Sequence, residues 1–414
     1  MSRAIGSVSA AVLVLVACRD NESAAPAELP ARDAGAMRDG EPAEAHDVEV
    51  LSATGLVPAP ERLTIPTAPW PEGIGPQCPD GYREISIGAS KCAVCRTGVV
   101  HCWGQANTQT FRAQASRTFR DDVVALTDLP PAKSMRSTEQ GGCILGTDGI
   151  VRCWGTQVAN SLRRSRTDRL ELVTIATPSP AVQLVAGYDH VCARGHDGEV
   201  TCWGGWNDYG QLGPWNSALE LEGLPRVIAG LRATTIASSS SSVCAIATDG
   251  QVWCWGAPPA VGDRHESKHA ATAIPGMTHA RALTVTAYES CALRDDGSIW
   301  CWGIPCAKQG ERNSNALAFQ RRVMRARPRK VAIAPWATQL SLAGDGPIAI
   351  DDDGHAFTFD RAGARVPVPG LAPVNSVTTA GCAACAILRT GELRCWGRGG
   401  LVLTVPGAAN APPP

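Results

Sequence analysis

Cysteines are the residues of this chain whose spacing points most clearly to a chemistry. The 414-residue sequence contains 17 cysteines, and many stand ten residues apart in a repeated phrase that ends in Cys-Trp-Gly. Two copies are CARGHDGEVTCWG from Cys192 and CALRDDGSIWCWG from Cys291. A cysteine can bind a metal, exchange electrons or form a structural disulfide, and spacing decides among these.

The ten-residue spacing predicts a disulfide across a β-hairpin. In every copy a glycine stands six residues after the first cysteine, where a three-residue hairpin loop needs a left-handed residue. In the copy around Gly198, that loop places Cys192 opposite Cys202 on antiparallel strands, within disulfide reach. We therefore predict six bonds: Cys92–Cys102, Cys143–Cys153, Cys192–Cys202, Cys244–Cys254, Cys291–Cys301 and Cys385–Cys395.

A seventh copy lacks both cysteines together. Between Pro347 and Asp360 the chain reads PIAIDDDGHAFTFD, and aligning Gly354 with the other turn glycines puts Ile348 and Thr358 at the cysteine positions. Phe359 stands where tryptophan is expected. Joint loss is what a bonded pair predicts, so we count seven hairpin units.

Two further motifs are C-x-x-C, at Cys92–Cys95 and Cys382–Cys385. Zinc binding or redox exchange is the functional interpretation. Residues three apart on a strand point to opposite faces, so structural disulfides are favoured and we expect no metal and no cofactor. The remaining cysteines Cys78, Cys95, Cys306 and Cys382 allow three pairings, which the sequence does not separate.

The elements that must carry these hairpins are strands. The second cysteine positions are 37 to 57 residues apart, which is typical of four-stranded propeller blades. Further strands are predicted in YREISIG from Tyr82, AVQLVAG from Ala181, PRVIAGL from Pro225, VPVPGL from Val366 and LVLTVPGA from Leu401. We predict an all-β protein: a seven-bladed β-propeller of four-stranded antiparallel blades, closed by joining the N- and C-terminal strands in one blade.

The stretch VAGYDHVCARGHDGEVTCWGGWNDYGQLG from Val185 resembles the repeat of the regulator of chromosome condensation family. That family folds as a seven-bladed β-propeller, and the resemblance covers about Cys78 to Ala408. Only the third unit keeps the GQLG ending, at Gly210 to Gly213, and the sixth is degenerate. Nuclear relatives act as guanine-nucleotide exchange factors, an activity we do not expect from an exported protein with paired cysteines.

The N-terminus predicts export. Arg3 precedes an apolar run over 10–17, and Leu15-Val16-Ala17-Cys18 resembles a bacterial lipoprotein box, which implies cleavage before Cys18 and its lipidation. A plain secretory signal is the alternative. We expect a signal peptide at 1–17, a lipidated Cys18 and disordered Ala/Pro/Glu-rich tether over 18–77, the propeller at 78–408 and a disordered tail at 409–414. The expected location is the cell envelope, in the outer or inner membrane, or the extracellular space.

Candidate contact residues lie on two segments. Trp206, Tyr209 and Trp215 follow the third hairpin as possible partner-binding aromatics, or as loop anchors. Arg321, Arg322 and Arg325 begin a basic run that ends at Lys330, either a patch for an anionic partner or a solvated loop. The six tryptophans of the Trp-Gly steps recur in every cysteine-bearing unit and so predict packing between blades.

No catalytic motif of the GxSxG, HExxH, P-loop or Rossmann type appears, and a formal net charge of −1 gives no reason to expect nucleic acid as a partner. We expect a monomeric, non-catalytic binding or scaffold module whose membrane contact is only through the lipid anchor. Its partner would be a protein or a surface polysaccharide. One alternative is an inhibitor of a secreted enzyme, resembling the β-lactamase-inhibitor propeller. Another is a polysaccharide-binding hydrolase or lyase.

Overall fold

The computed structural model describes a set of strands and their turns. The described residues are 78–87, 91–104, 120–126, 129–138, 141–155, 172–205, 207–214, 224–258, 268–287, 289–303, 327–343, 346–360, 362–368, 370–380 and 383–397. These ranges form 26 β-strands and no helix. They accordingly contain no helical segment with the length and hydropathy that crossing a bilayer requires. The predicted all-β class is confirmed.

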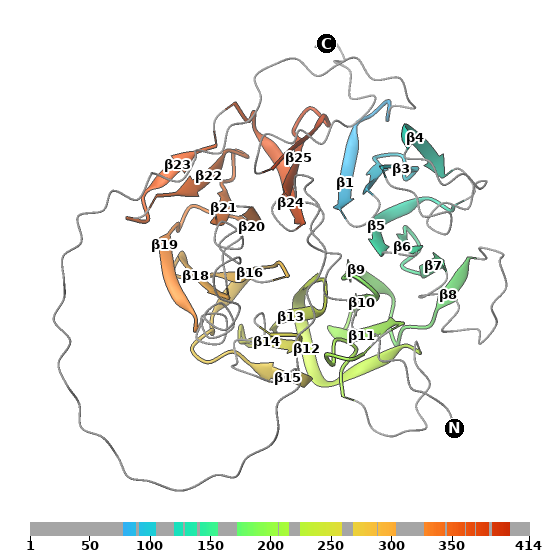
Figure 1. The fold of residues 1–414 in the computed structure, drawn as a ribbon, viewed down its shortest axis with the longest axis horizontal. Coiled ribbons are helices and arrows are strands. Elements are labelled where there is room, and N and C mark those ends of the chain that lie inside the picture. Colours follow the sequence, from blue (N-terminus) through green and yellow to red (C-terminus); the bar gives the residue numbers. More distant parts are fainter. Residues whose placement is uncertain are drawn as a thin grey trace, which may run out of the picture. The chain divides into compact units, whose positions relative to one another are not determined.

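The strands form antiparallel sheets in sequence order (Figure 1). The first sheet is β1 (Tyr82–Ile87), β2 (Lys91–Cys95), β3 (Val100–Gly104) and β4 (Arg120–Leu126). The second is β5 (Ala132–Thr138), β6 (Gly141–Gly146), β7 (Val151–Gly155) and β8 (Val173–Ile175). A seven-stranded sheet has β9 (Ala181–Ala186), β10 (His190–Gly195), β11 (Glu199–Gly204), β12 (Arg226–Ser239), β13 (Ser242–Ala247), β14 (Val252–Gly256) and β15 (Lys268–Ala273).

Three sheets follow. They are β16 (Ala280–Val285), β17 (Glu289–Arg294), β18 (Ser298–Gly303) and β19 (Arg329–Ile333); then β20 (Gln339–Ala343), β21 (Gly346–Ile350), β22 (Ala356–Phe359) and β23 (Arg365–Pro367); then β24 (Val374–Ala380), β25 (Ala383–Leu388) and β26 (Leu393–Gly397).

The hairpins have the predicted geometry. Cys192 lies directly opposite Cys202 in the ladder of β10 and β11, and the same register recurs in the other cysteine-bearing hairpins. The turn glycines are left-handed in all seven hairpins, with φ values of 93°, 78°, 85°, 79°, 77°, 81° and 88° at Gly98, Gly149, Gly198, Gly250, Gly297, Gly354 and Gly391. The glycine spacing in the sequence therefore located each turn.

The seven-stranded sheet joins two repeat units through one long strand. The first part of β12 pairs with β11, and its second part, from Ala233, pairs with β13. Two strands expected as separate elements are thus continuous in the third and fourth units. Gly230 has φ 73° with open space around it, so it allows the strand to bend between its two partners.

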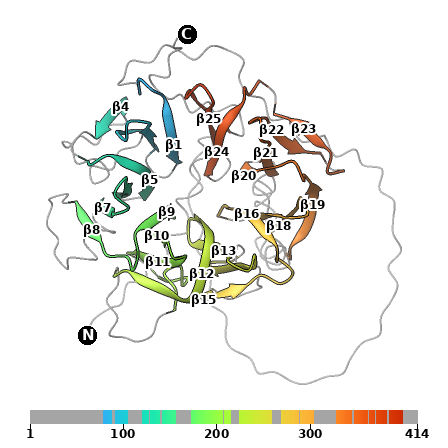
Figure 2. The ribbon, with the colours of Figure 1, turned by 180° about the vertical axis from the view of Figure 1, so that it is seen from behind.

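One backbone hydrogen bond recurs between consecutive units. The carbonyl of each turn glycine accepts from an N–H that leads into the next unit, in the pairs Ala132–Gly98, Ala181–Gly149, Ala233–Gly198, Ala280–Gly250, Ala334–Gly297 and Val374–Gly354. The same bond joins the last unit to the first, because the N–H of Tyr82 donates to the carbonyl of Gly391 at 3.1 Å. Strands β1 and β24 also contact each other (Figure 2).

The core consists of layers between units. Trp154, Trp203, Trp255 and Trp302 are buried, and each lies in the same hydrophobic cluster as the disulfide of the preceding unit. In the degenerate sixth unit, Phe359 packs against the cluster that holds Cys291 and Cys301. The predicted packing role of the Trp-Gly steps is confirmed for these four tryptophans.

One expectation about the sheets needs correction. The N- and C-terminal strands were expected to share one blade, but the first sheet already has four consecutive strands, because β4 follows its hairpin and pairs with β3. The last sheet has three strands among the described residues. The predicted strand from Leu401 to Ala408 lies outside the described part of the chain.

Candidate functional site

The loop over 207–214, after the third hairpin, is held in one shape by its own polar groups. The Asn207 side chain is buried; its Oδ1 accepts from the N–H of Leu212 at 2.8 Å, and its Nδ2 donates to the carbonyl of Gly213 at 3.1 Å. The N–H of Gly210 donates to the carbonyl of Asn207 at 2.9 Å. Gly210 and Gly213 have φ values of 80° and 92°, so both positions of the GQLG ending that carry glycine need it.

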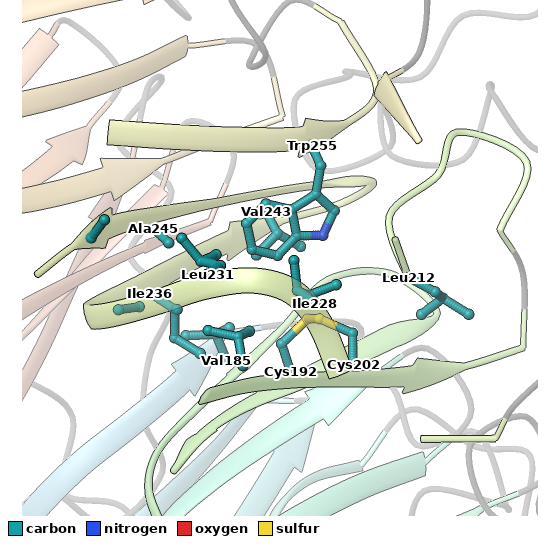
Figure 3. Close-up of a cluster of buried hydrophobic side chains, with 13 residues drawn as sticks. Val185, Cys192, Cys202, Leu212, Ile228, Leu231, Ile236, Val243, Ala245 and Trp255 are labelled. Atoms are coloured by element: carbon teal, nitrogen blue, oxygen red, sulfur yellow. A yellow bond between two sulfur atoms is a disulfide. The ribbon is translucent and has the colours of Figure 1, made fainter. Parts of the chain in front are cut away.

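Two contacts fasten this loop to the core, and Figure 3 shows their side chains Leu212 and Trp255. Leu212 is buried in the cluster that contains Ile228 and the Cys192–Cys202 disulfide. The indole N–H of Trp255, from the fourth unit, donates to the carbonyl of Gln211 at 3.0 Å. The loop is therefore anchored both to its own unit and to the next one.

Tyr209 is the aromatic residue that this loop presents to solvent, next to the exposed Asp208. Its side chain is 40% exposed, while Asn207, Gln211 and Leu212 around it are buried. The N–H of Tyr209 donates to Oε1 of Gln211 at 3.1 Å, which fixes its backbone. Little conformational entropy remains to be lost when a partner contacts a tyrosine on so constrained a backbone.

The structure describes part of the remaining predicted contact residues. Trp206, Trp215, Arg321, Arg322 and Arg325 lie outside the described residues, so their predicted roles stay predictions. The end of the basic run is described: Arg327, Arg329 and Lys330 are exposed, and Arg329 lies 3.7 Å from a carboxylate oxygen of buried Glu289. Cys18, the predicted lipidation site, also lies outside the described residues.

All six predicted hairpin disulfides are present. A further bond joins Cys78 to Cys95, which selects one of the three pairings that the sequence left open. The cysteines of the first C-x-x-C motif thus belong to two different disulfides, as the opposite orientation of their side chains requires. Cys306 and Cys382 lie outside the described residues.

A buried histidine lies beside this additional disulfide. Nδ1 of His101 is 3.7 Å from Sγ of Cys78 and 3.8 Å from Sγ of Cys95, and Tyr82 packs edge-on against the imidazole. Burial lowers the pKa of His101 and raises the pKa of Tyr82 to about 12, so both side chains are neutral near pH 7. Cysteine binds metals as the thiolate, and these sulfurs are bonded to each other.

Sequence reasoning missed an aromatic cluster on the sixth unit. Trp336 lies against Phe357 and Phe359, with ring centroids 4.9 Å and 6.4 Å away. The guanidinium of Arg365 lies 5.7 Å from the centroid of Trp336 and 5.3 Å from that of Phe357. The alternation of Phe357 and Phe359 on β22 was the available signal, since both side chains lie on one face of the strand.

Comparison with known proteins agrees with this geometry. Residues 181–211 match the regulator of chromosome condensation (RCC1) repeat. The chain contains an RCC1 repeat. The match covers β9 to β11 and reaches Gln211 in the loop that carries Tyr209. No curated protein matches the sequence.

Two solved structures resemble the fold. Human WBSCR16 matches with a TM-score of 0.56 and 14% identity, over 73% of this chain and 85% of that one. A chain in the crystal structure of Kap60 bound to yeast RCC1 (Prp20) matches with a TM-score of 0.50 and 18% identity, over 77% of this chain and 70% of that one. At these identities the similarity concerns the fold alone.

Proposed function

We propose that the RCC1-like protein is a closed seven-bladed β-propeller that acts as a non-catalytic protein-binding module. The closed ring is supported by the bond between Tyr82 and Gly391, which repeats at the last-to-first junction the same contact that joins the other six units. Residues of the first and last sheets also share one hydrophobic cluster, in which Tyr82 and Ile85 lie with Ile387 and Leu393.

The observation that carries the binding role is the presentation of Tyr209. An exposed tyrosine stands on a loop in which the side chains of Asn207 and Gln211 make internal hydrogen bonds and Leu212 packs in the core. A large, amphipathic side chain on a rigid backbone is the kind of residue that dominates protein interfaces. The yeast RCC1 structure, in which Kap60 is bound, supports a protein as the partner class.

The proposed location is the cell envelope or the extracellular space, through a lipidated Cys18 or a cleaved secretory signal. Seven described disulfides support an oxidising compartment. Metabolic labelling with a radioactive fatty acid tests the anchor. Label should enter the parent chain and be absent from Cys18→Ser. If the parent chain is exported but takes up no label, the N-terminus is a plain secretory signal and the protein is not a lipoprotein.

The binding role is tested by affinity capture from an envelope extract of the source organism. The bait is the full chain with Cys18→Ser and intact disulfides, and a reduced, unfolded sample is the negative control. We expect a discrete protein on the folded bait alone. Recovery of no protein, together with saturable polysaccharide binding or turnover, would contradict the proposal and favour a polysaccharide-active protein.

The site itself is tested by Tyr209→Ala. Loss of a central interface tyrosine should weaken binding of the captured partner about 30-fold, since hot-spot truncations cost about 2 kcal/mol or more. Leu224→Ala is the matched control, because Leu224 is also 40% exposed but lies outside the loop. Equal affinities for the two variants by calorimetry would show that the loop is not the contact surface.

A further inference from the structure

The Cys78–Cys95 disulfide differs from every other described disulfide in its position. The other six described bonds each close a hairpin over ten residues, whereas Cys78 precedes β1 and bonds to the end of β2 with a separation of 17 residues. It is an addition to the repeat and not part of it.

This bond also differs in access. All twelve hairpin cysteines are at most 2% exposed, and so is Cys95, but Cys78 is only partly buried. Thiol–disulfide exchange requires that a thiolate reach one sulfur in line with the bond that breaks. Among the cysteines of the described disulfides, Cys78 is therefore the most exposed residue.

A histidine ring nitrogen lies beside both sulfurs. His101 is 3% exposed, and its Nδ1 is 3.7 Å from Cys78 Sγ and 3.8 Å from Cys95 Sγ. A ring N–H at that place can stabilise a departing thiolate in a site that excludes water. The titratable side chain gathered with the Cys291–Cys301 disulfide is instead the carboxylate of Glu289, which would repel a thiolate.

We propose that Cys78, Cys95 and His101 form a thiol–disulfide exchange site that oxidises a dithiol, either a small dithiol or a dithiol protein. A thiolate of the dithiol attacks Sγ of Cys78; the Cys78–Cys95 bond breaks, and Cys95 leaves as a thiolate that a ring N–H of neutral His101 stabilises by a hydrogen bond and that takes its proton from solvent. The second thiolate of the partner then attacks the partner's own sulfur in the mixed disulfide and releases Cys78. The dithiol loses two electrons and two protons, and Cys78 and Cys95 gain them.

The fold holds the two cysteines together when the bond is open, so exchange is reversible. The N–H of Gly81 donates to the carbonyl of Cys78 at 3.0 Å, and the N–H of Arg96 donates to the carbonyl of Gly81 at 3.1 Å. Cys95 is opposite Tyr82 in the ladder of β1 and β2. None of these backbone contacts depends on the disulfide.

Graded reduction of the full chain tests the site. Dithiothreitol is the probe, in a Cys18→Ser background so that this thiol adds nothing to the signal; free thiols are alkylated and mapped by peptide mass spectrometry. Cys78 and Cys95 should open at a dithiothreitol concentration at least tenfold below that which opens the six hairpin disulfides. Simultaneous or earlier opening of a hairpin disulfide would overturn the proposal.

Two pairs of variants test the roles of the residues. His101→Asn should open Cys78–Cys95 about tenfold more slowly, whereas Tyr82→Phe, which alters the neighbouring ring without removing a ring N–H, should open it at the parental rate. In Cys95→Ser the thiol that remains is that of Cys78, and in Cys78→Ser it is that of Cys95. The Cys78 thiol should react with a disulfide reagent about tenfold faster than the Cys95 thiol. Equal rates within either pair would overturn the assignment, and circular dichroism verifies that each variant is folded.

Discussion

His190 shows how a single buried side chain carries a consequence for the behaviour of the protein. It is fully buried on β10, its Nε2 lies 2.8 Å from Oγ of Ser238 on β12, and its Nδ1 makes no hydrogen bond to the described residues. Burial lowers the pKa of His190 to about 3, so the folded protein holds the imidazole neutral. The imidazole of His190 thus links the third unit to the fourth while it is uncharged.

The free energy of unfolding should therefore fall with acid. Because the folded-state pKa lies below the ordinary value, the unfolded chain binds more protons; the contribution is fully present above about pH 6.5 and is lost as the pH falls toward about 3. Between about pH 7.5 and about pH 5 the parent should lose about 2 kcal/mol through this residue.

His190→Gln should remove that part of the acid sensitivity, and urea unfolding at the two pH values measures it. His196→Gln, in an exposed hairpin turn, is the control and should keep the parental difference. If His190→Gln and the parent lost the same free energy on acidification, the imidazole would already be protonated in the fold.

Some single residues could be anticipated from the sequence and others could not. The turn glycines were predictable, because a left-handed φ at a fixed distance from a cysteine is a local requirement. The partner of Cys78 and the position of His101 were not, since both depend on how the segment before β1 lies against β2 and β3. Trp255 was expected to pack between units, but its hydrogen bond to Gln211 depends on a loop of the neighbouring unit.

Among the elements, the hairpin with its disulfide is the unit of stability. Cys192 and Cys202 are directly opposed, and Trp255 of the next unit lies in the same cluster. The bond closes a short loop of the unfolded chain, which by chain entropy is worth about 3 kcal/mol.

Cys192→Ala with Cys202→Ala should therefore lower the free energy of unfolding by about 3 kcal/mol, measured by urea unfolding without reductant. The sixth unit provides the converse test. Its register pairs Ala349 with Phe357, and continuing it by one pair places Ile348 opposite Thr358. Ile348→Cys with Thr358→Cys should form a bond and raise the unfolding midpoint; a midpoint unchanged in both variants would show that these bonds contribute little.

The hairpins were predictable as elements, but their connections were less so. Alternation and turn residues are local signals, whereas the merging of two expected strands into β12 depends on β11 and β13 pairing with one continuous backbone. For the same reason the sequence did not show that β4 completes the first sheet. The sequence shows that a unit repeats, and only the pairing of β4 with β3 shows where one sheet ends.

For the whole molecule, the junction between the last and first units is the contact that closes the proposed ring. Gly391 has φ 88°, and a Cβ added there would lie 2.8 Å from Cα of Gly81. Gly370 has φ 69° but open space around it, so it provides a matched position with backbone strain and no clash.

Gly391→Ala should therefore destabilise the protein more than Gly370→Ala does. The strain at a left-handed position costs about 1 kcal/mol in both variants, and separation of the two backbones adds to it at Gly391 alone. Hydrogen exchange should also show faster opening of β1 and β25 in Gly391→Ala. Equal unfolding midpoints and equal exchange in the two variants would argue against a closed ring.

The bond from Tyr82 to Gly391 has one more implication. Six of the seven junctions are also crossed by the polypeptide, yet the seventh makes the same backbone contact without a peptide link between the two units. Two units can therefore be neighbours in space even where no peptide bond joins one to the other. A circular permutant that joins the two ends through a flexible linker, and opens the chain between two other units, should keep all seven contacts and refold with the same neighbours.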